Sequence, residues 1–149
     1  MPEIDDDSAL MKMEVAGICG TDVKMYQEPL RDGPLIMGHE TIGYIAKAGR
    51  EFTRRKGFKE GDLVFVEHYV PCFKCEWCHK GEYRLCESTD WRANPDSRRY
   101  GYTTSNNAPH LWGGFAEYVY LPWNAVVHKV PDGVTKCILR SILERRTCR

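Results

Sequence analysis

The chain has 149 residues and carries 21 lysines and arginines against 21 aspartates and glutamates, so its formal net charge is zero. This length accommodates one domain, and the charge balance argues against a protein that attracts phosphates of nucleic acids or membranes. No apolar run approaches the roughly 18 residues of a membrane span, and the N-terminus is acidic where a signal peptide would be basic. We therefore expect a cytoplasmic protein with no nucleic-acid or membrane partner.

The first half of the sequence predicts three short strands and one short helix. Residues 10–15 and 41–48 show the period of two that is typical of a strand with one buried face. A Gly-Asp turn signal precedes an apolar run at residues 63–66, which indicates a short buried strand. Between the first two strands, Thr21 or Asp22 could cap a short helix.

The second half is less regular. Residues 71–112 contain Asn-Pro, Asn-Asn and Ala-Pro breakers and little periodicity, so we expect an irregular lobe there. Strand patterns return at 115–121 and 126–130, and several short strands joined by long loops predict a mainly β domain, a barrel or a sandwich. The final segment, 136–149, is basic and has apolar residues at helical spacing, but a helix of this length is marginal alone.

Four of the seven cysteines, Cys72, Cys75, Cys78 and Cys86, follow the pattern C-x2-C-x2-C-x7-C. A two-residue gap lets consecutive thiolates face one ion at about 2.3 Å, and four sulfur ligands leave no open position, which indicates structural zinc. Iron is the chemical competitor, in a rubredoxin-like or iron–sulfur site. The neighbouring His79 is expected to face solvent. Because an irregular polar segment cannot offset its chain entropy by burial, we expect the metal to support the lobe.

A second group of residues could hold another metal ion. Cys19 follows the first predicted strand, and His39 precedes the second one. Taken singly, such a cysteine is more often a small buried apolar residue, and such a histidine a satisfied polar one. Together they supply one soft and one borderline zinc ligand, and the nearby carboxylates of Asp22 and Glu40 could orient an imidazole. A catalytic zinc needs three protein ligands and an open fourth position.

These residues lie in motifs that resemble the zinc-dependent alcohol dehydrogenases of the medium-chain dehydrogenase/reductase family. The resemblance covers roughly residues 8–135 and implies a GroES-like, partly open β-barrel with an irregular structural-zinc lobe and short helices. The matching motifs occur in the order of the family: G-I-C-G-T-D (17–22), G-H-E-x2-G-x5-G (38–49), G-D-L-V (61–64), the four cysteines (72–86), G-G-F-A-E-Y (113–118) and K-V-P-D-G-V (129–134).

The resemblance also implies a role for each residue of the second group. Cys19 and His39 would bind the catalytic zinc, with Glu40 as an alternate ligand beside the metal. Asp22 would hydrogen-bond the imidazole of His39, and Thr21 would be the first member of a proton relay.

The same resemblance implies the chemistry. In this family the zinc polarises the alcohol oxygen, and a hydride passes to NAD or NADP. The substrate would be a small-molecule alcohol or carbonyl compound, and the full-length enzyme is expected to be a homo-oligomer. His68 and Trp91 occupy positions where the family lines its substrate pocket, although a plain packing role is equally open for both.

The sequence departs from the family pattern at its end. It contains no G-x-G-x-x-G motif, so no cofactor-binding residue is assigned to this chain. The third catalytic-zinc ligand is expected just after residue 134, where Glu144 is a candidate about one position out of register, and Cys137 and Cys148 lack matching context. We therefore expect an N-terminally shortened catalytic domain at 1–135 and an atypical tail at 136–149, such as a truncated or frameshifted gene would encode.

Two functions from different classes remain open on this sequence. The first is the zinc-binding catalytic domain of an alcohol or polyol dehydrogenase, expected to be inactive as this chain alone. The alternative is a stand-alone structural zinc-binding module for interaction, without catalysis. A zinc-ribbon nucleic-acid binder is weaker, because acidic residues are mixed with the basic ones around the cysteines.

Overall fold

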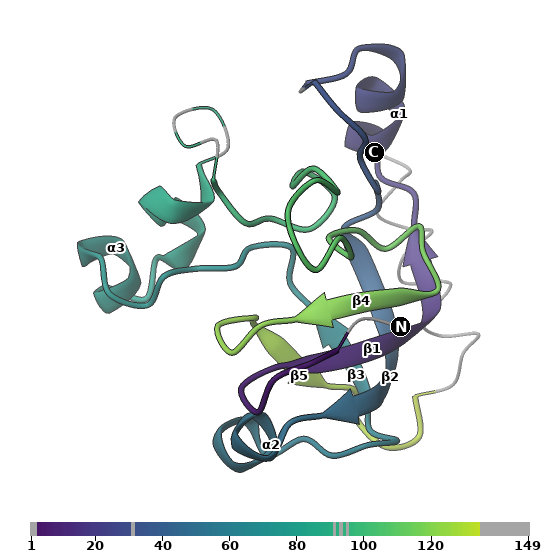
Figure 1. Cartoon of the computed structure of the whole chain (residues 1–149), viewed down its shortest axis with the longest axis vertical. Coiled ribbons are helices and arrows are strands. Elements are labelled where there is room, and N and C mark those ends of the chain that lie inside the picture. The colour runs from purple at the N-terminus through teal and green to yellow at the C-terminus, as the bar shows by residue number, and fades with distance from the viewer. Residues whose placement is uncertain (1–2, 31, 91, 93, 95, 135–149) are drawn as a thin grey trace.

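The computed structural model describes residues 3–30, 32–90, 92, 94 and 96–134. Five antiparallel strands form one curved sheet in the order β4–β1–β2–β3–β5 (Figure 1). The strands are β1 (Ala9–Gly17), β2 (Glu40–Ala48), β3 (Leu63–Val66), β4 (Tyr118–Leu121) and β5 (Val127–Lys129). The mainly β class and the partly open barrel expected from the sequence are confirmed.

The longest pairing joins β1 to β2, and glycine makes its close approach possible. Gly43 on β2 lies opposite Met13, where a Cβ atom would clash with the backbone carbonyl of Lys12. The expected strand at 63–66 matches β3, whereas the one expected at 115–121 begins only at Tyr118. Its first residues instead lie against the loop before β2, since the amides of Gly114 and Phe115 donate to carbonyl groups of that loop.

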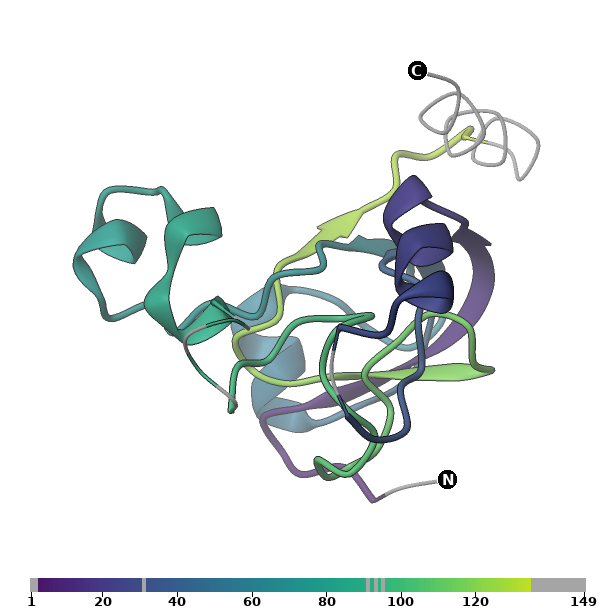
Figure 2. The ribbon, with the colours of Figure 1, turned by 90° about the horizontal axis from the view of Figure 1, so that it is seen from above.

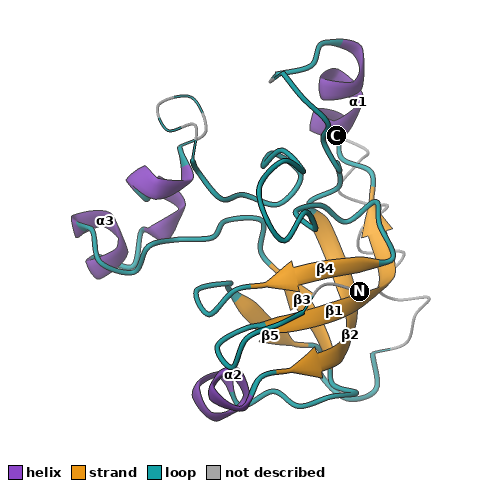
Figure 3. Cartoon of the chain, in the orientation of Figure 1, coloured by secondary structure: helices purple, strands orange, loops and turns teal. Residues whose placement is uncertain are grey.

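Two helices flank the sheet at opposite ends, as Figure 3 shows. The first, α1 (Gly20–Gln27), was expected, but its N-cap is Cys19 and not Thr21 or Asp22. The second, α2 (Arg50–Lys56), was not predicted. It lies between Gly49 and Gly57, and Gly57 ends it in the left-handed conformation at φ 74°, which glycine adopts without strain.

The core is an apolar cluster enclosed by the sheet and the loops that cross it. The loops contribute Tyr100 and Trp112, which are 0% and 3% exposed and come from the region expected to be irregular. That region therefore divides: its second half packs into the barrel, and only its first half projects. The core side chains of the strands and of α2 are Ala9, Met11, Ile45, Phe52, Val64, Val66, Val119 and Leu121.

The projecting half is the cysteine lobe, residues 71–90, which stands out from the sheet in Figure 2. It contains the short helix α3 (Glu76–His79) and two single turns of 3-10 helix, η1 (Tyr83–Leu85) and η2 (Glu87–Thr89). The hydroxyl of Tyr83 ties the lobe to the barrel, because it donates to Oε1 of Glu67 at 2.8 Å. None of the helices in the described ranges has the length and apolar character needed to cross a membrane.

Candidate functional site

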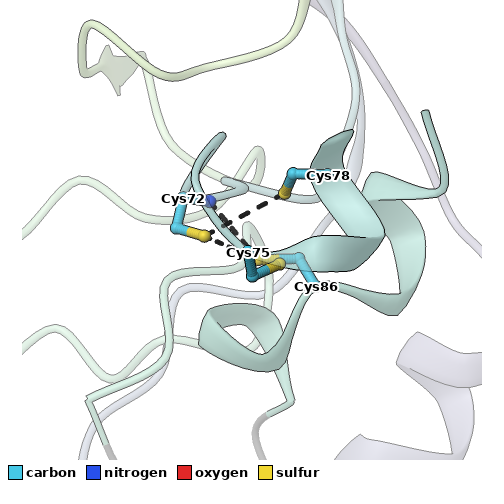
Figure 4. A group of neighbouring side chains, drawn as sticks. All are labelled: Cys72, Cys75, Cys78 and Cys86. Atoms are coloured by element: carbon cyan, nitrogen blue, oxygen red, sulfur yellow. Dashed lines mark hydrogen bonds between the residues drawn. The ribbon is translucent and has the colours of Figure 1, made fainter. Parts of the chain in front are cut away.

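The four cysteines of the lobe converge on one point, as Figure 4 shows. Their sulfur atoms all lie within 4.8 Å of one another, and the Sγ of Cys72 lies 3.5 Å from that of Cys86 and 4.0 Å from that of Cys78. Tetrahedral zinc with Zn–S bonds of about 2.3 Å places its sulfur ligands about 3.8 Å apart. The arrangement therefore fits a four-sulfur zinc site.

The electrostatics of the cluster also call for a cation. Burial raises the pKa of the Cys72 thiol, but backbone N–H groups of Lys74 and Cys75 outweigh it and lower that pKa to about 6. Burial and the neighbouring sulfur atoms of Cys75 and Cys86 raise the pKa of Cys78 to about 12. Four adjacent thiols cannot all ionise unless a positive ion compensates them, and a zinc ion would supply that charge.

Little else stabilises the lobe. Neither α3 nor η1 has a buried residue, and of the lobe's helical elements only η2 contributes one, Thr89. His79 is exposed, as expected. A segment without an apolar core would gain its order from a bound metal ion, which would couple metal binding to folding of the lobe.

The second group of predicted residues meets where β1 ends and α1 begins. Cys19 caps α1, and its backbone N–H donates to Oδ2 of Asp22 at 2.8 Å. The other oxygen of Asp22 accepts from the amide of Gly38 at 3.1 Å, which brings the loop before β2 next to the helix. The Asp22 carboxylate, 2% exposed, thus holds the two segments together and places His39 beside Cys19.

The pair of Asp22 and His39 has the geometry of a carboxylate that orients a metal-binding imidazole. Nδ1 of His39 is buried and lies 3.5 Å from Oδ1 of Asp22, close enough for an electrostatic contact but too far for a regular hydrogen bond. Burial disfavours the charged ring, but the Asp22 carboxylate outweighs it and raises the pKa of His39. With Nδ1 facing Asp22, Nε2 remains for a metal ion.

Cys19 provides a sulfur ligand next to this imidazole. Burial raises the pKa of its thiol, whereas hydrogen bonds from Thr21 and His39 outweigh burial and lower it. The hydroxyl oxygen of Thr21 lies 3.7 Å from the Cys19 sulfur, so the predicted relay residue stands at the same point. A thiol that ionises more readily than usual, beside an imidazole, suits zinc.

The carboxylate of Glu40, at the start of β2, lies against the end of the neighbouring strand β1. Its Oε2 atom is buried without a hydrogen-bond partner and lies against Gly17, where a Cβ atom would clash with it. Within the described residues, only the four lobe cysteines form a group of three or more potential ligands this close together. Cys19 and His39 thus form an incomplete site there; Glu144, the candidate third ligand, lies outside the described residues.

The wall of this site contains aromatic residues and one arginine. His68, predicted to line the pocket, packs edge-on against His39 with ring centroids 5.2 Å apart. Sequence reasoning missed Tyr102, whose ring lies 5.7 Å from that of His39, and Arg99, whose Nη2 lies 3.0 Å from Nε2 of His68. No spacing signal singles out these residues, because the irregular loop brings them in. Trp91, the other predicted pocket residue, lies outside the described residues.

A family model described as the alcohol dehydrogenase GroES-like domain matches residues 5–132. The chain therefore belongs to this family, the N-terminal domain of zinc-dependent dehydrogenases of the medium-chain dehydrogenase/reductase family. It is similar to the Mycobacterium tuberculosis protein named "Probable alcohol dehydrogenase adh", with 40% identity over 131 residues that cover 87% of this chain and 34% of that protein.

Further relatives are dehydrogenases. A sorbitol dehydrogenase of Bombyx mori is 34% identical over 140 residues, covering 91% of this chain and 35% of its own length. The solved structure of an alcohol dehydrogenase from Thermotoga maritima superposes with a TM-score of 0.73 at 28% identity, covering 95% of this chain and 38% of that one. The chain thus spans about a third of the length of the curated relatives it matches.

Proposed function

We propose that the chain is the zinc-binding catalytic domain of an alcohol or polyol dehydrogenase, which moves a hydride between a small alcohol and NAD or NADP. The observation that carries this proposal is the grouping of Cys19, Asp22 and His39. A sulfur and an imidazole ligand, with a buried carboxylate behind the imidazole and no complete four-residue cage, is typical of a catalytic zinc. The orphaned oxygen of Glu40 nearby supports the same interpretation.

Bound at this site, zinc would supply a Lewis acid that favours the ionised form of an alcohol. The protein's own residues prepare the site for it. The two oxygens of Asp22 fix the entry to α1 and the loop before β2, and one of these oxygens faces the ring of His39. The hydroxyl of Thr21, at the Cys19 sulfur, would take up the proton that leaves the substrate hydroxyl and release its own proton to solvent, as the first member of a relay. Glu40 serves as the alternate ligand.

The substrate class follows from the relatives. Two of them are named as dehydrogenases of sorbitol and of L-threonine. The solved structure of an acetophenone reductase from Geotrichum candidum is in complex with NAD. It is 26% identical to this chain with a TM-score of 0.69, and the superposition covers 95% of this chain and 38% of the reductase. We infer a small alcohol, polyol or carbonyl substrate, with His68 and Trp91 in its pocket and Glu144 as third ligand. Because the sequence has no G-x-G-x-x-G motif, we infer that this chain alone does not turn over.

Metal content tests the proposal. The purified chain, saturated with zinc and freed of excess, should hold two zinc ions, and His39→Ala should hold one. Atomic absorption measures both, and His110→Ala, which removes an exposed histidine, is the matched control that should keep two. One zinc ion in wild type, unaffected by His39→Ala, would instead favour the alternative of a structural zinc module, since the lobe cysteines form the one complete ligand group of the described residues.

A further inference from the structure

Arg99 is held next to the candidate active site by two tyrosines. The centre of its guanidinium group lies 4.6 Å from the centroid of the Tyr69 ring and 4.2 Å from that of Tyr102. Its Nη2 atom lies 3.0 Å from Nε2 of His68. A guanidinium only donates, so Nε2 of His68 accepts and the proton of this imidazole lies on Nδ1. Contacts on three sides fix the planar group in one orientation.

The hydrogen-bonding capacity of this arginine is largely unused. The guanidinium has five N–H donors, of which one is engaged by His68. Its Nε atom is buried and has no partner. No carboxylate within the described ranges forms an ion pair with Arg99, and the Asp22 carboxylate accepts from two backbone amides instead. A half-buried guanidinium with unused N–H donors and no carboxylate partner is able to bind an anion.

The guanidinium of Arg99 lies close to the candidate zinc ligand His39, where a substrate would bind. His68 bonds to Arg99 and also contacts the ring of His39, and Tyr102 contacts both Arg99 and His39. The guanidinium is therefore one side chain away from a candidate zinc ligand. A molecule whose hydroxyl lies at Cys19 and His39 would bring the next few atoms of its chain towards Arg99.

We propose that Arg99 is a specificity-determining residue that binds an oxyanion, a carboxylate or a phosphate, on the alcohol substrate. This rests on the proposed dehydrogenase function and narrows it from alcohols in general to alcohols that carry a negative group a few bonds from the reacting carbon. A guanidinium matches both oxyanions, because two parallel N–H groups reach two oxygens. The stacking on Tyr69 and Tyr102 prepares the group for this contact.

Binding of matched ligands to the full chain tests the proposal. Zinc-loaded protein is titrated by calorimetry, at constant ionic strength, with lactate against propane-1,2-diol and with glycerol 3-phosphate against glycerol. Wild type should prefer one anionic member over its neutral counterpart, and the preferred pair identifies the oxyanion. Arg99→Gln should weaken binding of that anion by about tenfold or more, as expected for a lost charge-assisted contact, and leave the neutral member unchanged.

Three controls keep the result interpretable. Arg50→Gln removes an exposed arginine on α2 and should bind like wild type. Arg99→Lys retains the charge and should keep part of the preference for the anionic ligand. Thermal melting followed by circular dichroism establishes that both Arg99 variants fold. A purely structural Arg99 would change stability but not the ratio of anionic to neutral affinity, and an unchanged ratio in folded Arg99→Gln overturns the proposal.

Cys19→Ser separates this proposal from the proposed function. An anion preference that persists in Cys19→Ser and disappears in Arg99→Gln supports the role of Arg99. A preference that disappears in Cys19→Ser and persists in Arg99→Gln places the anion on the metal and overturns it. The proposed function fails on a different measurement, the zinc content, if Cys19→Ser leaves it unchanged.

Discussion

At the scale of single residues, the buried carboxylate of Asp22 does most to assemble the candidate active site. It accepts from the amides of Cys19 and Gly38 and faces the ring of His39. Burial raises the pKa of this carboxyl, but these three partners outweigh burial and lower it. The group is therefore an anion in the folded protein, and it couples the ends of two loops to the orientation of a metal ligand.

Asp22→Asn should weaken zinc at the second site by about ten- to a hundredfold, the usual loss when the partner of a metal-binding histidine is removed. The side-chain NH2 group of the new asparagine would also face the backbone N–H of Cys19 or of Gly38, so that two donors meet. The melting temperature should therefore fall. Competition with a chromophoric chelator measures the affinity. Asp90→Asn, an exposed carboxylate on the lobe, should match wild type in both measurements. Equal zinc affinity in Asp22→Asn would show that this carboxylate does not support a metal ligand.

The residues of this site differ in how visible they were in the sequence. Cys19, Asp22 and His39 lie in short motifs whose glycines set the local turns, so their meeting could be predicted from family resemblance. Arg99 and Tyr102 could not be predicted, because they lie on a loop whose path depends on packing of Tyr100 and Trp112 in the core. A loop without periodicity carries no local signal of which side chains it brings to a site.

At the scale of elements, the pairing of β1 with β2 depends on one glycine. Gly43→Ala should destabilise the fold by about 1–3 kcal/mol, because the new methyl group meets the backbone of Lys12, which cannot move without opening the sheet. Gly20→Ala is the matched control, since no atom lies within 4 Å of its added Cβ and alanine favours the helix α1. Urea unfolding of both variants gives the two free energies. A Gly43→Ala protein as stable as Gly20→Ala would contradict the close approach of the strands.

The cysteine lobe should unfold independently of the barrel. Cys75→Ser should lose one zinc ion and make residues 71–90 sensitive to protease, because no apolar core remains to order them. The amides of β1 and β2 should keep their protection from hydrogen exchange, since the core cluster contains no residue of α3, η1 or η2. His79→Gln should leave zinc content and protease resistance unchanged. Loss of amide protection throughout the sheet would instead show that the lobe and the barrel unfold as one unit.

Elements also differ in their predictability. The strand β3 was predicted to the residue, because a turn signal and an apolar run define it locally. The helix α2 was missed, since its one buried residue, Phe52, gives no apolar periodicity, and its charged residues are as common in loops. Its glycine boundaries, Gly49 and Gly57, were the available signal.

At the scale of the whole molecule, the chain is a mainly β domain with two candidate metal sites of different kinds. One is a closed set of four sulfur atoms in a lobe without a core, and the other is an open pair of ligands held at the barrel by a buried carboxylate. The spacing of the cysteines was sufficient to predict that their four sulfur atoms converge. The second site needed the resemblance, because each of its residues is common and only their joint occurrence is informative.

The strand order has a consequence for how the chain emerges from the ribosome. The strand β1, which lies between β4 and β2 in the sheet, is synthesised first and meets β2 soon afterwards, but its other neighbour, β4, begins only at Tyr118. Throughout synthesis of the lobe and the loop that follows it, one edge of β1 has no partner. Pairings this distant in sequence form slowly, and an open strand edge invites association with other chains. The nascent chain is thus most vulnerable to aggregation until Tyr118–Leu121 has been synthesised and has paired with β1.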